Sequence, residues 1–412
     1  MKKKNGFISM ALVYSFLVIF LFIMSSIINV YLRKNAYLEA LENQVGEDIG
    51  ITKESRATLI SKILESNVSQ LANNIDYTKI SALDNGNGVY YLTDGTKIDE
   101  NNDSAYTRIY FFRGNVDNNV VYGTENDGTQ ALKVCWKIIR TNDNGTIRLI
   151  YNGKLDPSTG CTGSTPYITA GTNKFNEYSN DNAYVGFSYG KVGATSYNET
   201  HRNEETQIST IRNTLENWIE TKFESNIATE KSADTIYCND RRIYNLGESL
   251  PAAASNLNIS NPTGFNNNET VYKGYEMLSN NVSYMCNESG DRYALKTSFI
   301  NNAGNINNVY NSAFDKNPIA LPTIADIVYA GGAYNQANTN YFLKAGTAYW
   351  TMTPAFYSNN SGANMFIVSS DGAISTSPTD NDNIKIRPVI SINGDIKVNA
   401  GYGTKEEPYI LE

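Results

Sequence analysis

The sequence predicts an α+β fold: an N-terminal transmembrane helix and a helical stalk, followed by a mixed, loop-rich outer region. Three observations lead to this expectation. An apolar run covers residues 7–30, apolar side chains recur at helical spacing over 37–73, and short β-rich runs alternate with Asn- and Gly-rich loops after residue 85. The expected segments are a basic leader (1–6), a transmembrane helix (7–31), a helical stalk (32–80), an outer α+β region with disulfides (81–300) and a C-terminal segment (301–412).

The apolar run from Phe7 to Val30 is long enough to cross a bilayer. At a helical rise of about 1.5 Å per residue it spans roughly 36 Å, more than the ~30 Å of hydrocarbon. The lysines at 2–4 and the free amine outnumber Arg33 and Lys34, so the positive-inside rule places the N-terminus in the cytoplasm. A cleaved signal peptide is the alternative, but its apolar region is normally shorter and ends at small residues. We therefore expect a single-pass protein of the cell membrane, with the bulk of the chain extracellular.

A basic leader, then Gly6, Phe7 and a long apolar helix, resembles the N-terminus of type IV prepilins and pseudopilins. In that family a membrane peptidase cuts after the Gly, which implies cleavage between Gly6 and Phe7 and methylation of Phe7. The resemblance implies a prepilin peptidase and pilus machinery as partners. The family usually has Glu at the fifth mature position, where this chain has Ala11, and this departure argues against polymerisation. A plain signal-anchor is the alternative.

The stretch from 37 to 73 is polar, but its apolar side chains recur every three or four residues, as in a helix. The recurring residues are Leu38, Leu41, Val45, Ile49, Leu59, Ile63, Leu64, Val68 and Leu71. Gly46 and Gly50 interrupt the first part and weaken its helical preference. We expect a stalk that lifts the outer region off the membrane.

The sequence of the outer region predicts short strands and one helix. KVCWKIIRT (133–141) and TIRLIYNG (146–153) flank the Asn-Gly-containing segment 142–145, which predicts a β-hairpin. An amphipathic stretch near 206–224 predicts a helix with one apolar face toward the core. The residues of that face are Ile208, Ile211, Leu215, Trp218, Ile219 and Phe223.

Four cysteines on the outward side of a membrane favour disulfides. Three pairings are possible, and proximity in the sequence favours Cys135–Cys161 and Cys238–Cys286. Each bridge would contribute on the order of 3–4 kcal/mol by closing a loop. No C-x-x-C or Cys/His spacing supports a zinc site instead.

Nine strings from residue 110 onward carry a resemblance as a set: YFFRGNV (110–116), CWKIIRT (135–141), DNAYVGFSYG (181–190), YCNDR (237–241), PIALPTIADIVYAGG (318–332), YWTMTP (349–354), FIVSSDGAIS (366–375), IRPVISI (386–392) and GYGTKEEPYIL (401–411). Together they resemble Asn-rich cell-surface proteins of Firmicutes-type bacteria. Those proteins end in a domain similar to C-type-lectin folds of the formylglycine-generating-enzyme-like branch. The resemblance implies a lectin-like fold for the extracellular region, centred on the C-terminal segment.

Two polar loops, 355–365 and 375–383, lie between the strands expected in this segment. In the fold that the resemblance implies, the segment before the RPV strand contacts the ligand. Aromatic, amide and hydroxyl side chains suit such a surface. We expect adhesin- or receptor-like binding of an external protein or glycan there. The candidate ligand-binding residues are Tyr349, Trp350, Phe356, Tyr357, Asn359, Asn360, Asn364, Ser377, Thr379, Asp380, Asn381 and Asp382. The alternative is a minor pilin or pseudopilin, a structural subunit of a type IV filament or secretion apparatus.

Composition argues against several other functions. A net charge of −8 without a basic face argues against nucleic-acid binding. The lone His201 lies in a polar stretch, which we expect to be a solvated loop, and no hydrolase motif is present. The absence of Cys after Cys286 argues against the cysteine-dependent oxidation found in the formylglycine-generating branch. Asp380 and Asp382 offer oxygen ligands, but no calcium-loop motif surrounds them. We expect no enzymatic activity, no cofactor and no bound metal.

Overall fold

The residues described by the computed structural model are 58–59, 61–62, 69–84, 86–92, 108–126, 128–142, 145–203, 207–224, 235–257, 262–295, 313–314 and 318–411. Within these residues, no helix combines the length and the apolar character that crossing a membrane requires. The expected transmembrane helix (7–31), the Gly6–Phe7 cleavage site and residues 32–57 of the expected stalk lie outside the described residues.

The expected α+β class is wrong for the described residues, which are mostly β-sheet with few helices. Their α-helices are α3 (Tyr197–His201), α4 (Thr210–Thr221) and α5 (Ile324–Ala330). The end of the expected helical stalk also differs from the prediction. There β1 (Gln70–Leu71) pairs in parallel with β2 (Gly88–Leu92), and the 3-10 turn η2 (Ala72–Asn74) follows β1. Helical spacing of apolar residues is a weak preference, and pairing with a strand further along the chain overrides it here.

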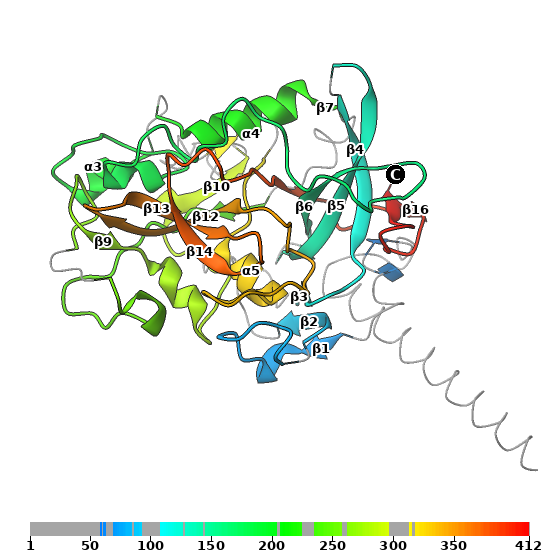
Figure 1. Ribbon diagram of the computed structural model, residues 1–412, viewed down its shortest axis with the longest axis horizontal. Helices are drawn as coiled ribbons and strands as arrows, with labels where there is room; N and C mark the ends of the chain where they lie inside the picture. Colours follow the sequence, from blue (N-terminus) through cyan, green and yellow to red (C-terminus); the bar gives the residue numbers. More distant parts are fainter. Residues whose placement is uncertain are drawn as a thin grey trace, which may run out of the picture.

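The largest sheet has ten strands and combines segments from both ends of the described chain (Figure 1). Its main path runs β1-β2-β3-β5-β4-β17-β16, while β6 pairs with β5, β15 with β6, and β7 with β4. The further bounds are β3 (Ile109–Arg113), β4 (Asn119–Asn126), β5 (Ala131–Thr141), β6 (Ile147–Lys154), β7 (Phe223–Glu224), β15 (Val389–Ile392), β16 (Val398–Ala400) and β17 (Tyr409–Leu411). Strands from before and after residue 300 therefore share one sheet.

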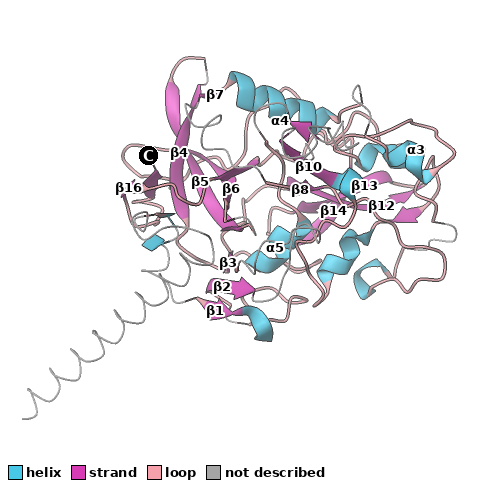
Figure 2. Cartoon of the chain, turned by 180° about the vertical axis from the view of Figure 1, so that it is seen from behind, coloured by secondary structure: helices cyan, strands magenta, loops and turns pink. Residues whose placement is uncertain are grey.

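Two smaller sheets accompany it, in the orders β14-β13-β12-β9 and β11-β10-β8. Their bounds are β8 (Tyr237–Cys238), β9 (Thr270–Val271), β10 (Arg292–Leu295), β11 (Ala313–Phe314), β12 (Tyr349–Ser358), β13 (Gly362–Val368) and β14 (Ile374–Pro378). Short 3-10 turns connect the strands: η3 (Asn182–Val185), η4 (Ala252–Ala254), η5 (Lys273–Leu278) and η6 (Ser289–Asp291). Figure 2 shows the β4–β6 region and the β12–β14 region side by side, with α5 between them.

Several local predictions are confirmed. β5 and β6 form the expected hairpin, with Thr141 paired to Ile147 across the turn. The expected helix near 206–224 is α4, in which Ile211, Leu215, Trp218 and Ile219 are buried. Ile208 precedes this helix and Phe223 lies in β7, so these two do not belong to its face. α5 begins with a capping box between Thr323 and Asp326 and ends at Gly331, whose φ of 111° suits glycine.

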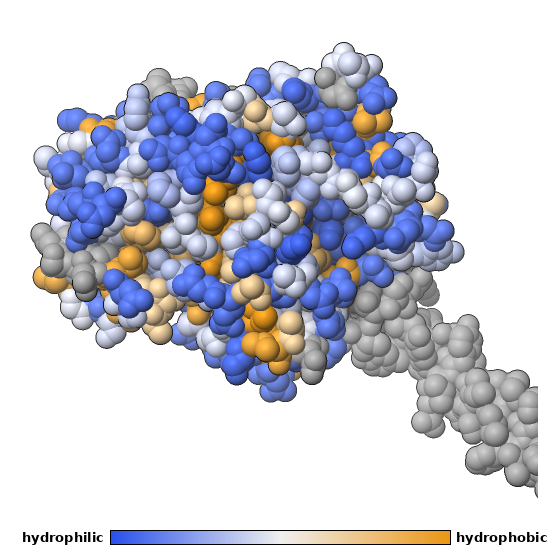
Figure 3. Space-filling model, viewed as in Figure 1, coloured by the Kyte–Doolittle hydropathy of each residue, from blue (hydrophilic) through white to orange (hydrophobic). Residues whose placement is uncertain are grey.

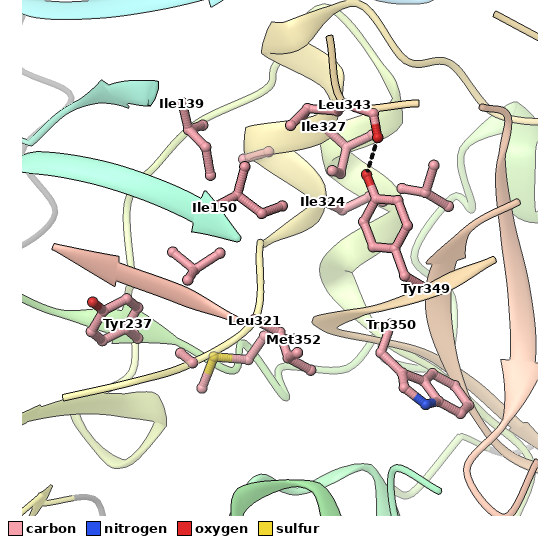
Figure 4. Close-up of a cluster of buried hydrophobic side chains, with 14 of the residues drawn as sticks. Ile139, Ile150, Tyr237, Leu321, Ile324, Ile327, Leu343, Tyr349, Trp350 and Met352 are labelled. Carbon is pink, nitrogen blue, oxygen red and sulfur yellow. Dashed lines mark hydrogen bonds between the residues drawn. The ribbon is translucent and has the colours of Figure 1, made fainter. Parts of the chain in front are cut away.

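The core is continuous from one sheet to the other through α5 (Figure 4). Every residue of α5 is buried, because the helix contacts β3 and β5 on one side and β12 on the other. Ile139 and Ile150 of the large sheet and Trp350 and Met352 of β12 belong to the same hydrophobic cluster. The helix therefore fixes the two sheets relative to each other.

Candidate functional site

Half of the residues predicted to bind ligand are buried, which corrects the expected surface. They are Tyr349, Trp350, Tyr357, Asn364, Ser377 and Thr379, each no more than 4% exposed. Tyr349, Trp350 and Tyr357 lie in β12, which has β13 and β9 along its edges and the core against it. The other three lie in β13, in β14 or directly after β14. The Trp350 indole donates to the carbonyl of Asn173 at 2.6 Å, and the Tyr349 hydroxyl donates to the carbonyl of Leu343 at 2.9 Å (Figure 4). These side chains stabilise the fold and are not available at the surface.

The remaining predicted residues lie at or near the surface. Asn359, Asn360, Asp380 and Asp382 are exposed, and Phe356 and Asn381 are partly buried. Their loops rest on a segment at 172–184 that sequence reasoning did not associate with them.

That segment fastens both loops by backbone contacts. The amide of Ala363 donates to the carbonyl of Ser179 at 2.6 Å, and the Thr379 hydroxyl donates to the carbonyl of Tyr178 at 2.8 Å. The Asp382 carboxylate accepts from the Asn173 amide and the Thr172 hydroxyl, and these bonds, the amide first, lower the pKa of Asp382. The ring of Tyr178 is 58% exposed, so this surface presents an aromatic that the sequence pattern did not reveal.

A second region has a volume in the range of ligand sites. A cavity of about 650 Å³ lies between β4, β6 and the loop that follows β6, and we call it the groove. Its charged and aromatic lining residues are Glu125, Tyr151, Lys154, Asp156 and Tyr167, and its small hydroxyl residues are Thr162, Ser164, Thr165 and Thr169. Ligand pockets commonly measure about 300–1,000 Å³. Figure 3 shows one face of the molecule as mostly hydrophilic with small, separate apolar patches.

The groove contains a charged anchor. The Tyr151 hydroxyl donates to Glu125 Oε2 at 2.7 Å, and Lys154 Nζ lies 3.6 Å from Glu125 Oε1. Burial, and then the Glu125 charge, raise the pKa of Tyr151 far above its usual value, so this phenol stays protonated as a donor. The Tyr151 ring packs edge-on against Trp136 and Trp218, each with a centroid separation of 5.7 Å. The anchor therefore has a fixed orientation.

The wall of the groove is held by a disulfide. Cys161 lies in the loop 155–169 and is bonded to Cys135 in β5, with Cα atoms 5.8 Å apart. The Cys161 amide donates to the carbonyl of Lys405 at 2.7 Å, and the Ile168 amide donates to the carbonyl of Ile386 at 3.0 Å. The loop is therefore attached to distant segments at its middle and near its end.

Both predicted disulfides are confirmed: Cys135–Cys161 and Cys238–Cys286, with sequence separations of 26 and 48 residues. The described residues contain no free cysteine. Sequence reasoning did not associate the first bridge with a binding site. The run CTGSTPYIT (161–169), small hydroxyl residues around one tyrosine next to a bridged cysteine, was the available signal.

Within the described residues, no cluster of three or more His, Cys, Asp or Glu could hold a metal ion. His201 is not in a solvated loop: it is buried in α3, with its ring 4.3 Å from the ring of Tyr197. Burial, and then the charge of Arg241, lower its pKa well below the usual value. The imidazole is therefore neutral in the fold and lines neither the groove nor the loop surface.

In comparisons with known proteins, no family model matches this chain, and no curated protein or solved structure matches it. The resemblances to prepilins and to lectin-like surface proteins therefore stay predictions from the sequence.

Proposed function

We propose that this protein binds an external, hydroxyl-rich ligand, such as a glycan, in the groove. The observation that carries the proposal is the combination of a cavity of about 650 Å³ with a fixed carboxylate–phenol–ammonium anchor and a lining of hydroxyl groups. Glu125 and Tyr151 are themselves buried, so they act by holding the half-buried Lys154 ammonium in place. Sugar hydroxyls both donate and accept, so they suit a site that offers this ammonium beside exposed threonine hydroxyls. The ring of Tyr167 adds an apolar contact face of the kind that glycan sites use.

The disulfides favour an extracytoplasmic location, which suits this function. Two disulfides in one chain are typical of proteins that work outside the reducing cytosol. Attachment to the cell membrane, with the bulk of the chain outside, stays a prediction from the sequence. The alternative role as a minor pilin rests on residues 1–31, which lie outside the described residues.

The experiment measures binding of the purified full-length protein to a panel of mono- and oligosaccharides, by glycan array and then by calorimetry. Tyr167→Ala and Lys154→Ala should weaken binding at least tenfold. The matched controls are Asn360→Ala and Asp380→Ala, on the exposed part of the C-terminal loops.

The two sets of variants separate the two locations. Loss of binding in the controls, with binding retained in the groove variants, would move the site to the C-terminal loops. Binding of no saccharide at all would refute the proposed ligand class.

A further inference from the structure

A second, smaller pocket has two buried arginines at its base. Arg140 in β5 and Arg148 in β6 are 2% and 1% exposed, and they flank Asp326 of α5, which is fully buried. The pocket has a volume of about 30 Å³ and is lined further out by half-buried residues that include Cys238, Ser283 and Met285. We call it the arginine pocket.

The charges in the arginine pocket do not cancel. Asp326 Oδ1 accepts from Arg140 Nε at 2.9 Å, whereas Asp326 Oδ2 lies 3.6 Å from Arg148 Nη1, beyond hydrogen-bond reach. That second oxygen already accepts from the amide and hydroxyl of Thr323 at 2.9 Å each, as part of the helix cap. One carboxylate therefore faces two guanidinium groups, which leaves a net charge of +1.

The other acidic residue of the lining does not remove this excess. Asp240 accepts two bonds from the guanidinium of Arg242, at 2.8 Å and 2.7 Å, so that pair is neutral by itself. Burial and the charge of Arg140 lower the pKa of Arg148 to about 10, as expected for a cation without full compensation. An isolated positive charge in such a place is costly unless an anion accompanies it.

Unused donors also converge there. Arg140 donates through Nε to Asp326 and twice through Nη1, to Thr141 and Asn142. Arg148 donates only from Nη2 to the carbonyl of Ile236, and its buried Nε has no partner. The buried hydroxyl of Tyr284, whose ring lies 3.9 Å from the Arg140 guanidinium carbon, has none either. Buried donors are normally satisfied, so these two groups, next to an uncompensated positive charge, favour an acceptor in the pocket.

We propose that the arginine pocket binds a compact monovalent anion: a halide or a small carboxylate. The volume admits only one or two water-sized species, which excludes a large anion. A single negative charge on the anion would neutralise the net charge of +1. The Cys238–Cys286 bridge lies at the pocket, since Cys238 lines it, and holds the 283–286 segment over the arginines.

The test follows the thermal unfolding of the full-length protein in sodium chloride or sodium formate, at constant ionic strength made up with sodium gluconate. Specific binding should raise Tm saturably, by about 2 °C at ten times Kd. Broadening of the ³⁵Cl resonance by the protein reports the site directly, and its reversal by formate shows that a carboxylate enters the same place.

The variant Arg148→Gln removes the excess charge and should abolish both the Tm response and the line broadening. The matched control is Arg113→Gln, another fully buried arginine, which pairs with Asp84 at 2.8 Å away from the pocket; it should keep both responses. Tyr284→Phe deletes only the unpartnered hydroxyl and should weaken chloride binding several-fold, even if Arg148→Gln does not fold. Equal Tm values in chloride, formate and gluconate, without line broadening, would mean that water alone fills the pocket and would overturn the proposal.

Discussion

Removal of the Cys135–Cys161 bridge should destabilise the protein and loosen the wall of the groove. The perturbation is the double replacement Cys135→Ala and Cys161→Ala. For a loop closed over 26 residues, the chain-entropy relation gives about 3.5 kcal/mol of lost stability. The two sulfur atoms also pack with Val121 and Leu155 in a small apolar cluster, and their loss adds a cavity cost of about 1 kcal/mol. The expected total is therefore about 4–5 kcal/mol.

The matched control is the double replacement of Cys238 and Cys286 by Ala, which opens a bridge over 48 residues. The same relation gives about 4 kcal/mol for this loop. The two variants thus lose similar stability while they affect different sites. The variant without Cys135–Cys161 should have reduced ligand affinity in the groove and an unchanged chloride response of the arginine pocket. The variant without Cys238–Cys286 should lose the chloride response and keep its ligand affinity in the groove.

Denaturant unfolding under oxidising conditions, followed by tryptophan fluorescence, gives the free energies for both variants. Ligand calorimetry and ³⁵Cl line widths give the two binding properties. A stability loss below about 1 kcal/mol for the first variant would refute the assigned role of the bridge. Equal loss of groove affinity in both variants would refute the separation of the two sites.

Two further outcomes follow from buried side chains. Burial and the charge of Arg241 lower the pKa of His201 in the folded protein. The stability that the neutral imidazole contributes is therefore complete above pH 6.5. It is lost as the pH falls toward the folded-state pKa, by up to about 1.4 kcal/mol per pH unit. The variant His201→Gln should lack this slope in urea melts between pH 7 and pH 5, and identical slopes in both proteins would contradict the assignment. Trp350→Ala should cost about 3–5 kcal/mol of unfolding free energy, because Trp350 is fully buried. A binding defect in this variant with an unchanged urea midpoint would contradict that structural role.

Features set by neighbours in the chain could be predicted from the sequence. The Asn-Gly-containing segment 142–145 was enough for the β5–β6 hairpin. The disulfides also followed from proximity along the chain. In each case the deciding interaction joins residues in one local stretch or in one loop of moderate length.

Features set by distant segments could not be predicted. Trp350 and Tyr357 are residue types that are common at binding surfaces. The segment at 172–184 covers their strand, however, and makes them part of the core. The wall of the groove is held by hydrogen bonds to Lys405 and Ile386. These residues lie more than 200 positions further along the chain than the loop that they hold. Nothing in a single sequence indicates that Arg140 and Arg148 meet Asp326, because only the packing of α5 between the sheets places that carboxylate beside them.

Each disulfide lies at the edge of one concave site, and physical reasons explain this arrangement. The wall of the groove, 155–169, and the segment over the arginine pocket, 283–286, are loops without regular strands or helices. Such loops lose conformational entropy when they are ordered. A covalent bond to β5 or β8 supplies the constraint without filling the cavity beside it. Under reducing conditions both sites should therefore lose their shape before the central core around α5 unfolds, which links the proposed binding functions to an oxidising location.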